Sequence, residues 1–378
     1  MKPLHAILRR ETARDAVLPF VRFMELALYC PDCGYYEMKM DAAGRRGDFY
    51  TSVSVGALFG QLLAFQFAEW LDEMQRPDDG RRIVEAGAHD GKLAADILSW
   101  LKDCRPRLFA KIEYVILEPS PRRQAWQRQT LKDHLSRVRW LSGFDVTTPQ
   151  AFSGIIFCNE LLDAMPVRRL GWDAWNKQWF EWGVAFDGGK LVWARCPRST
   201  AASHGEKAGM EALPPVILDL PSSLLEVLPD GCTVEISPAA ERWWREAAAS
   251  LARGKLMALD YGLTDDELFS PGRTRGTLRA YFRHHAAADP LANPGEQDLT
   301  AHVNFSAIQK AGEEAGLQTE LFSSQAKFLT QILAGTQRDK TFGEWTSARA
   351  RQFQTLTHPE HLGRAFRVLV QSRPGGRR

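Results

Sequence analysis

The stretch that decides the fold reads Glu85-Ala86-Gly87-Ala88-His89-Asp90-Gly91. A short apolar run, 82–85, leads into it, and an amphipathic pattern follows it from 92 to 101. A short apolar run indicates a buried strand, and apolar residues at intervals of three or four indicate a helix. Glycine between the two lets the backbone turn tightly and lets a ligand approach the helix N-terminus. The stretch is therefore typical of the first strand–turn–helix unit of a nucleoside-binding α/β protein.

The glycine positions distinguish two kinds of cofactor. A dinucleotide fingerprint that starts at Gly87 requires glycine at 89 and 92, where the chain has His89 and Lys92. A nicotinamide-dependent oxidoreductase is therefore the weaker hypothesis. The pattern acid-x-G-x-G-x-G is the first turn of S-adenosylmethionine-dependent methyltransferases, and this chain matches it except at His89. A tight turn without a ligand is the simpler alternative. The predicted cofactor-binding residues of this turn are Glu85, Gly87, His89 and Gly91.

Short apolar runs continue to alternate with amphipathic helices along the chain, which predicts a mostly parallel sheet. Three more runs read as strands before a break in the pattern, a fifth strand follows the break, and two runs near the C-terminus complete seven. We therefore expect an α/β protein with a Rossmann-like core. The runs beyond the first are 114–117, 138–141, 154–158, 255–259, 318–322 and 366–370.

The chain divides into three predicted regions. Residues 1–80 read as a helical N-terminal cap, and residues 81–166 together with 232–378 as the Rossmann-like core. Residues 167–231 begin with a tryptophan-rich alternation of period two around Asp187-Gly188-Gly189, which predicts antiparallel hairpins. We expect this β-rich insertion after the fourth strand to lie on the substrate side. The segments expected to be loops are 196–215 and 283–297, and the tail 373–378 is expected to be disordered.

Polar residues follow three of the predicted strands, at the edge where open α/β sheets bind ligands. Glu118 ends the second strand, where a carboxylate can accept both ribose hydroxyls; a solvated strand-end glutamate is the alternative. Asp145, after the third, is a candidate for the adenine amino group or for a simple turn. Glu160, after the fourth, would hold a cationic acceptor or serve a neutral one as general base. Asn159 and Asp163 complete the predicted catalytic group, and Asp163 is also a candidate helix cap.

Composition excludes several classes of protein. The 378 residues carry 48 Lys+Arg against 46 Asp+Glu, so coating nucleic acid or anionic lipid is disfavoured as the main task. The uncharged run 49–68 is long enough to span a bilayer, but its polar residues and helical spacing favour a buried helix. Cys30 and Cys33 form a single CxxC without a second pair, so no metal site is predicted. We expect neither membrane insertion nor a nucleic-acid partner.

Short segments along most of the chain occur in the order of a known family. They are Gly34-Tyr-Tyr36, Gly47-Asp-Phe49 with Thr51-Ser52, Leu58-Phe-Gly60, Glu85-x-Gly87, Glu118-Pro-Ser-Pro121, Asn159-Glu160-x-x-Asp163-Ala-x-Pro166, Asp260-Tyr-Gly262, Gly276-Thr-Leu278 and Asp298-x-Thr-Ala-His302-Val-x-Phe305. The chain thereby resembles the MidA-like class I methyltransferases, whose mitochondrial members methylate an arginine of a respiratory complex I subunit during assembly.

The resemblance implies a class I methyltransferase fold and S-adenosyl-L-methionine as cofactor. It also implies a protein side chain such as arginine as methyl acceptor, and a bacterial, cytoplasmic protein. Two further cofactor contacts are implied, Tyr36 and Thr51. The implied substrate pocket consists of Tyr261, Asp298, Thr300 and His302.

The chain departs from the family pattern at three places. Family members usually have P-G where this chain has Ala88-His89, and His89 would either donate a hydrogen bond to the ligand's carboxylate or obstruct it. The family's T-S-P-E reads Thr51-Ser-Val-Ser54, and a glutamate common after L-F-G is Gln61. The two lost carboxylates suggest a divergent paralogue. Together with His89, they also support a rival hypothesis, a non-catalytic assembly or binding protein that keeps the fold, with or without the cofactor.

Overall fold

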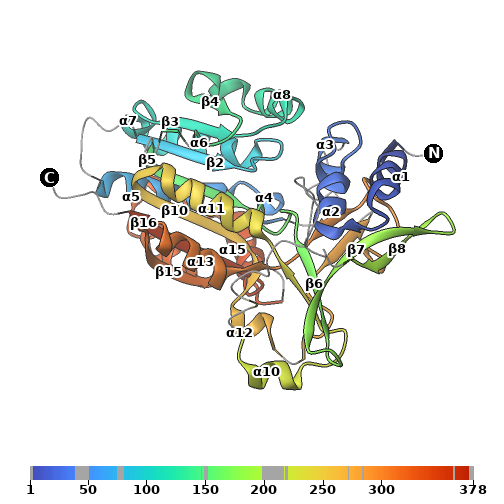
Figure 1. Cartoon of the computed structure of the whole chain (residues 1–378). Helices are drawn as coiled ribbons and strands as arrows, with labels where there is room; N and C mark the ends of the chain where they lie inside the picture. Colours follow the sequence, from blue (N-terminus) through green and yellow to red (C-terminus); the bar gives the residue numbers. More distant parts are fainter. Residues whose placement is uncertain are drawn as a thin grey trace. The chain divides into compact units, whose positions relative to one another are not determined.

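The chain folds into two compact units (Figure 1). The sheet unit comprises residues 39–163, 242–262 and 308–378, and the hairpin unit comprises residues 1–38, 164–241 and 263–307. The residues that this computed structural model describes are 3–38, 51–74, 81–145, 147–148, 152–197, 217, 220–270, 272–282, 285–360 and 362–373.

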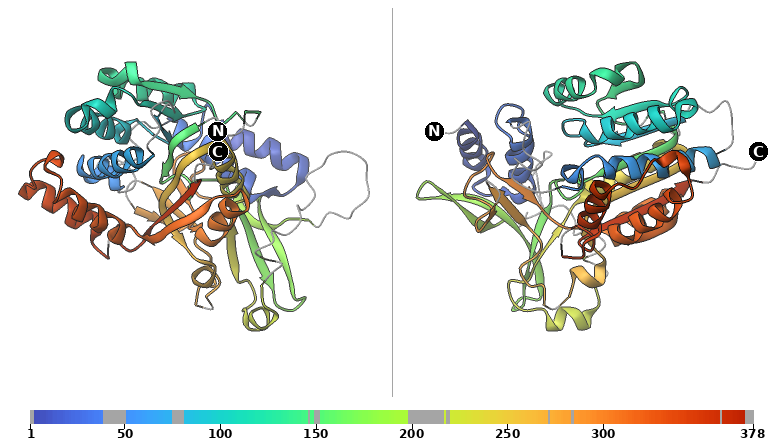
Figure 2. Two further views of the ribbon diagram at one scale, coloured as in Figure 1. Left: turned by 90° about the vertical axis from the view of Figure 1, so that its left-hand side faces the viewer. Right: turned by 180° about the vertical axis from the view of Figure 1, so that it is seen from behind.

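One mostly parallel sheet forms the centre of the sheet unit (Figure 2). Its strands follow the order β15-β16-β10-β5-β2-β3-β4. The first five strands in chain order run parallel, and β16 runs antiparallel to both β10 and β15. All seven predicted strands are present, so the Rossmann-like α/β fold is confirmed. The bounds are β2 Arg81–Ala86, β3 Glu113–Leu117, β4 Val138–Leu141, β5 Phe152–Asn159, β10 Leu251–Leu263, β15 Gln318–Ser324 and β16 Phe366–Arg373.

The strand order identifies the ligand-binding edge of this sheet. From β2 the chain proceeds outward through β3 to β4, and it then returns to the other side of β2 as β5. Open α/β sheets bind ligands beyond the carboxyl ends of the strands at such a reversal. We therefore expect the segments that follow β2, β3 and β5 to contain the ligand-binding residues.

Helices cover both faces of the sheet. Side chains of α5, α6, α14 and α15 share one apolar cluster with strand residues that include Phe157 and Val368. Gln371 on β16 points to the opposite face, because side chains alternate along a strand. It accepts a hydrogen bond from Trp244 of α11 and donates one to the backbone of Gln309 in α13, both at 2.8 Å. The bounds are α4 Ser52–Val55, α5 Leu58–Glu73, α6 Lys92–Cys104, α7 Pro106–Phe109, α8 Pro121–Thr130, η1 Lys132–Arg137, α11 Pro238–Ser250, α13 Phe305–Glu314, α14 Gln325–Thr336, η2 Lys340–Phe342 and α15 Ser347–Thr357.

Helix α5 is the buried helix predicted from the uncharged run. Leu58, Leu62 and Phe65 are each at most 4% exposed. The part of this run before Thr51 lies outside the described residues. Among the helices that the structure describes, none combines the length and the apolar character needed to cross a membrane.

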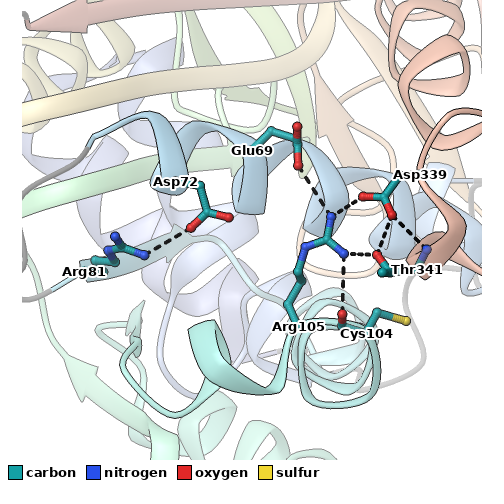
Figure 3. Close-up of polar contacts among 7 residues, drawn as sticks. All are labelled: Glu69, Asp72, Arg81, Cys104, Arg105, Asp339 and Thr341. Atoms are coloured by element: carbon teal, nitrogen blue, oxygen red, sulfur yellow. Dashed lines mark hydrogen bonds and ion pairs between the residues drawn. The ribbon is translucent and has the colours of Figure 1, made fainter.

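An arginine at the end of α6 ties α5 to η2 (Figure 3). Arg105 forms ion pairs with Glu69 of α5, at 3.5 Å, and with Asp339, and it donates to the hydroxyl of Thr341. Only 15% of the Arg105 side chain is exposed. A guanidinium that is largely removed from water needs such partners to offset its lost hydration.

The hairpin unit contains two antiparallel sheets. In one the order is β1-β7-β6-β9 with β8 paired to β7, and in the other it is β12-β11-β13. Gly188 and Gly189 connect β7 to β8 with φ of 52° and 83°, which matches the turn that hairpins prefer, so the predicted hairpin is confirmed. The bounds are α1 Pro3–Asp15, β1 Leu18–Pro19, α2 Phe20–Tyr29, α3 Tyr35–Met38, β6 Arg168–Asp173, β7 Gln178–Asp187, β8 Lys190–Arg195, α10 Ser222–Val227, β9 Thr233–Ile236, α12 Asp265–Leu268, β11 Arg279–Phe282, β12 His285–Ala287, β13 Asp298–Thr300 and β14 Val303–Asn304.

The units divide the chain at boundaries other than those expected from the sequence. Residues 1–38 of the predicted cap belong to the hairpin unit, where the rings of Phe20 and Trp193 lie 4.9 Å apart. Residues 232–241 and 263–307, expected in the core, also belong to this unit. Periodicity shows which face of an element is apolar but not which sheet that face covers, and this is why it misplaces the boundaries.

Two segments predicted to be irregular contain β-strand residues in the structure. The expected loop 283–297 contains the strand β12, which at three residues is too short to show an alternation. Arg373, assigned to the disordered tail, is the last residue of β16. Most of the expected loop 196–215, from residue 198 on, and the tail from residue 374 lie outside the described residues.

Candidate functional site

The turn between β2 and α6 has a backbone that alternates into the left-handed region. Gly87, His89 and Gly91 have φ of 75°, 47° and 85°. Glycine adopts this conformation at no cost, whereas other residues seldom do, although histidine is among those enriched there. His89 therefore keeps the backbone that the pattern's glycine would provide. The replacement of glycine by His89 therefore adds a side chain to the turn but leaves its backbone conformation in the left-handed region.

The side chain of His89 is partly buried, and its two ring nitrogens differ. Nδ1 lies 3.9 Å from Oδ1 of Asp90. Nε2 is buried and has no hydrogen-bond partner among the described residues. A buried polar atom without a partner is costly unless something else, such as a ligand, satisfies it.

Glu85 lies inside the sheet. It is 2% exposed and accepts a hydrogen bond of 2.6 Å from the hydroxyl of Tyr114 on β3. Burial raises the pKa of the Glu85 carboxyl to about 8. In this arrangement Glu85 joins β2 to β3, and its expected contact with the cofactor stays a prediction.

Glu118, directly after β3, holds a carboxylate with a fixed orientation. Oε1 accepts from the backbone N–H of Ser120 at 2.9 Å and pairs with Arg123 at 3.0 Å. Oε2 accepts from the side-chain amide of Gln127 at 3.2 Å. The side chain is only 2% exposed. The structure thus presents Glu118 as an oriented acceptor rather than as the solvated glutamate that the sequence left open.

Asp145 is exposed and serves its own turn. Oδ1 accepts from the backbone N–H and the hydroxyl of Thr147, at 2.9 and 2.6 Å, and Oδ2 accepts from the hydroxyl of Thr148 at 2.9 Å. These hydrogen bonds lower the pKa of the Asp145 carboxyl. This is the turn role that the sequence allowed, and the adenine contact stays a prediction.

Glu160 follows β5 in a conformation that is unusual for its residue type. Its φ is 51°, in the left-handed region. Its Oε1 accepts from the backbone N–H of Ser52 at 3.3 Å and from the side-chain amide of Asn159 at 3.2 Å. The other end of the Asn159 amide, Oδ1, is buried without a hydrogen-bond partner in the described part of the chain. Non-glycine residues held in this way gather at functional sites, because the strain persists only where the surroundings impose it.

Asp260 holds the turn that follows Glu160. It is fully buried, and its Oδ2 accepts from the backbone N–H groups of Leu161, Leu162 and Asp163 at 3.1, 2.8 and 3.4 Å. Asp163 itself is 7% exposed. Asp260 is not among the site residues predicted from the sequence, although it follows the fifth predicted strand just as Glu118 and Glu160 follow the second and the fourth.

The two lost carboxylates lie at places with structural roles in this chain. Thr51 is the N-cap of α4: its hydroxyl accepts from the N–H of Ser54, and the Ser54 hydroxyl accepts from the N–H of Thr51, both at 3.1 Å. Glutamate is the usual partner in such a capping box, and here Ser54 takes its place. Gln61 accepts from Arg349 at 3.1 Å through its remaining oxygen. Both positions therefore have structural partners in this chain, and the Thr51 hydroxyl accepts a hydrogen bond from its own helix.

The predicted substrate residues belong to both units, and their common pocket stays a prediction. Asp298 and Thr300 lie on β13 of the hairpin unit, and the hydroxyl of Tyr36, expected at the cofactor, donates to Asp298 at 2.7 Å in the same unit. The backbone N–H of His302 donates to Thr277 at 3.1 Å, and burial lowers the pKa of the His302 imidazole to about 4. Tyr261 belongs to the sheet unit, where its ring lies 3.9 Å from that of Phe366.

No cluster of three or more metal-ligating side chains occurs within the described ranges.

The whole chain was also compared with known proteins. Residues 62–323 match a family described as "Putative S-adenosyl-L-methionine-dependent methyltransferase". The chain is 27% identical over 399 residues to "Protein arginine methyltransferase NDUFAF7 homolog, mitochondrial" of Drosophila melanogaster, covering 96% of this chain and 83% of that protein. It is also 27% identical over 326 residues to "Protein arginine methyltransferase NDUFAF7, mitochondrial" of Danio rerio, covering 77% and 68%.

Solved structures agree with this result. A crystal structure of a protein from Burkholderia thailandensis, bound to S-adenosyl-homocysteine, is 36% identical to this chain with a TM-score of 0.81. The match covers 98% of this chain and 92% of that one. A second crystal structure from the same organism is 35% identical, with a TM-score of 0.80.

Proposed function

The chain belongs to this family of S-adenosyl-L-methionine-dependent methyltransferases, and on that premise we propose that it methylates an arginine side chain of a protein, with Glu160 holding the guanidinium. The observation that carries the proposal is the left-handed backbone of Glu160, with φ of 51°, directly beyond the buried strand β5. Relatives of this chain are named protein arginine methyltransferases.

The residues at the carboxyl edge of the sheet fit this cofactor. Its amino-acid part carries a carboxylate and an ammonium group. His89 Nε2 can donate to the former and Asn159 Oδ1 can accept from the latter, and both atoms are buried without hydrogen-bond partners among the described residues. Glu118 is an oriented acceptor for the ribose hydroxyls. When bound, the cofactor supplies a methyl group on an electrophilic sulfonium.

The role of Glu160 follows from its charge and its fixed position. A carboxylate forms paired, charge-assisted hydrogen bonds with a guanidinium, and these set the direction of the acceptor nitrogen. Correct alignment contributes much of the rate when the electrophile is already reactive. Ser52 and Asn159 keep the carboxylate in one place. Ser54 and Gln61 have structural partners in this chain, so their missing charge is weaker support for a non-catalytic assembly protein.

The test is Glu160→Gln, which keeps the shape of the side chain and removes its charge. We expect S-adenosylhomocysteine affinity to stay within about 1 kcal/mol of the wild type, because His89 and Glu118 are untouched and the new side chain keeps an oxygen that can accept from Asn159. Transfer of labelled methyl into the proteins of a cell lysate should fall by roughly 100-fold or more. Glu113→Gln is the matched control, since Glu113 pairs with Arg82 at the amino end of β3. Full transfer by Glu160→Gln would refute the proposal, and loss of binding together with unfolding would make Glu160 structural.

We also propose a cytoplasmic location in a bacterium. All six cysteines are free thiols in the structure, as a reducing compartment would leave them. Fractionation of the native cell, with the protein detected by antibody, tests this location. Recovery in the membrane or an exported fraction would contradict it.

A further inference from the structure

A glutamine on α8 contacts both segments that flank the proposed cofactor site. Gln127 is completely buried. Its amide nitrogen donates to the backbone carbonyl of His89 at 3.0 Å and to Oε2 of Glu118 at 3.2 Å. Its amide oxygen accepts from the indole N–H of Trp140 on β4 at 2.9 Å. One side chain therefore links the turn after β2, the carboxylate after β3 and the strand β4.

The orientation of this amide is determined by its partners. An indole N–H can only donate, and a carbonyl and a carboxylate can only accept. The oxygen of Gln127 must therefore face Trp140, and both amide hydrogens are directed at His89 and Glu118. Trp140 is held in turn by Arg128, whose guanidinium carbon lies 4.0 Å from the centre of the tryptophan ring.

Gln127 also packs directly against the turn. A side chain at Gly91 would bring its Cβ to 3.3 Å from Cα of Gln127. The helix α8 and the turn after β2 are thus in close contact at the residue that carries the amide. A shift of either segment would break the bond to His89 or the bond to Glu118.

We propose that Gln127 is a positioning residue for the cofactor: it fixes the separation between the His89 turn and the Glu118 carboxylate. The inference rests on the proposed role of Glu118 in binding the ribose. His89 has a left-handed backbone, with φ of 47°, and the hydrogen bond from Gln127 holds its carbonyl in this conformation. Without this hydrogen-bonded link, the distance between the sites for the amino-acid part and the ribose would vary. The cofactor would then contact both sites at once less often and bind more weakly.

The experiment measures the affinity of the full chain for S-adenosylhomocysteine by calorimetry. Gln127→Leu removes both donors at similar volume, and we expect it to weaken binding by about 10-fold or more. Gln124→Leu is the matched control: Gln124 lies on the same helix and donates to the backbone carbonyl of Glu118, at 2.8 Å, but not to its carboxylate. We expect its effect to stay below about 3-fold.

A double-mutant cycle distinguishes positioning from general support of the fold. In the Glu118→Gln background, Gln127→Leu should weaken binding by less than about 3-fold, because the bridge has already lost its charged end. Gln127→Leu should also raise KM for S-adenosylmethionine while kcat stays within about 2-fold, since no reacting group is touched. Trp140→Phe removes the hydrogen bond to the amide oxygen of Gln127 but keeps an aromatic ring in the same place. If Gln127 must be held in one orientation, we expect cofactor binding to be about 3-fold to 10-fold weaker.

The outcomes separate this inference from the proposed role of Glu118. Weaker binding by Glu118→Gln with unchanged binding by Gln127→Leu would overturn the role of Gln127 alone. Unchanged binding by Glu118→Gln would overturn the ribose assignment and the bridge with it. Fully additive losses would also overturn the bridge. If Gln127→Leu fails to fold, Trp140→Phe decides, and wild-type affinity in that variant would count against the inference.

Discussion

Replacing Glu160 by glycine and by alanine measures the backbone strain at the proposed acceptor site. Both changes remove the carboxylate and its hydrogen bonds to Ser52 and Asn159. The two variants therefore differ only by the Cβ atom, which restricts the backbone. The left-handed conformation costs a non-glycine residue about 1–2 kcal/mol. Glycine avoids that cost but loses roughly 0.5–1 kcal/mol more on folding, because its unfolded chain is freer. The midpoints of these two ranges differ by about 0.75 kcal/mol, and we expect Glu160→Gly to be more stable than Glu160→Ala by about that amount.

The assay is equilibrium unfolding in urea followed by circular dichroism. Ser153, on the same strand, provides the control, since its φ is not positive. There the order should reverse, with Ser153→Ala more stable than Ser153→Gly by about 0.5–1 kcal/mol. Both Glu160 variants should lose methyl transfer to the same extent. Equal stability of Glu160→Gly and Glu160→Ala, or a more stable Glu160→Ala, would refute the inference that the backbone of Glu160 is strained.

Further predictions concern the remaining residues of the sheet unit. His89→Gly should weaken S-adenosylhomocysteine binding by about 1 kcal/mol in calorimetry, because the buried Nε2 would be missing; tighter binding would show that His89 obstructs the ligand. The free energy of unfolding should fall as pH rises from about 5 to about 8, because the Glu85 pKa, raised to about 8 by burial, lies above its unfolded value. Glu85→Gln should flatten that decline in urea titrations at several pH values, and an unchanged slope would assign it to other groups. Arg105→Ala should destabilise the fold by about 1–2 kcal/mol, whereas Arg81→Ala, whose partner Asp72 is 56% exposed, should cost no more than about 1 kcal/mol; equal losses in a thermal melt would contradict this reasoning.

The elements that the sequence predicts well are those with local signals. The turn at 85–91 lies between a strand and a helix that both show in their apolar pattern, and the seven sheet strands are found where that pattern places them. The hairpin at Gly188 and Gly189 is equally local, because two glycines specify its turn. Strands of two or three residues, such as β12 and β13, have too few positions to show a period and are not predicted.

The parts that escape prediction depend on contacts between distant segments. Gln127 appears as an ordinary helix residue until α8 is packed against a turn 38 positions earlier in the chain. The left-handed backbone of Glu160 cannot be predicted from the sequence, because glutamate has no preference for that conformation. The missing glutamate at Ser54 suggests lost chemistry, and only the capping box shows that the position serves a helix.

Arginine methylation itself is tested most directly by identifying the methyl acceptor. The purified protein is incubated with isotopically labelled S-adenosylmethionine and a lysate of its own cell, and tryptic peptides are sequenced by mass spectrometry. Glu160→Gln run in parallel reports labelling that does not depend on the proposed site. The account predicts a labelled methyl on an arginine side chain of a discrete protein, strongly reduced with Glu160→Gln. Label on a small molecule, on another side chain, or at equal levels with Glu160→Gln would contradict it.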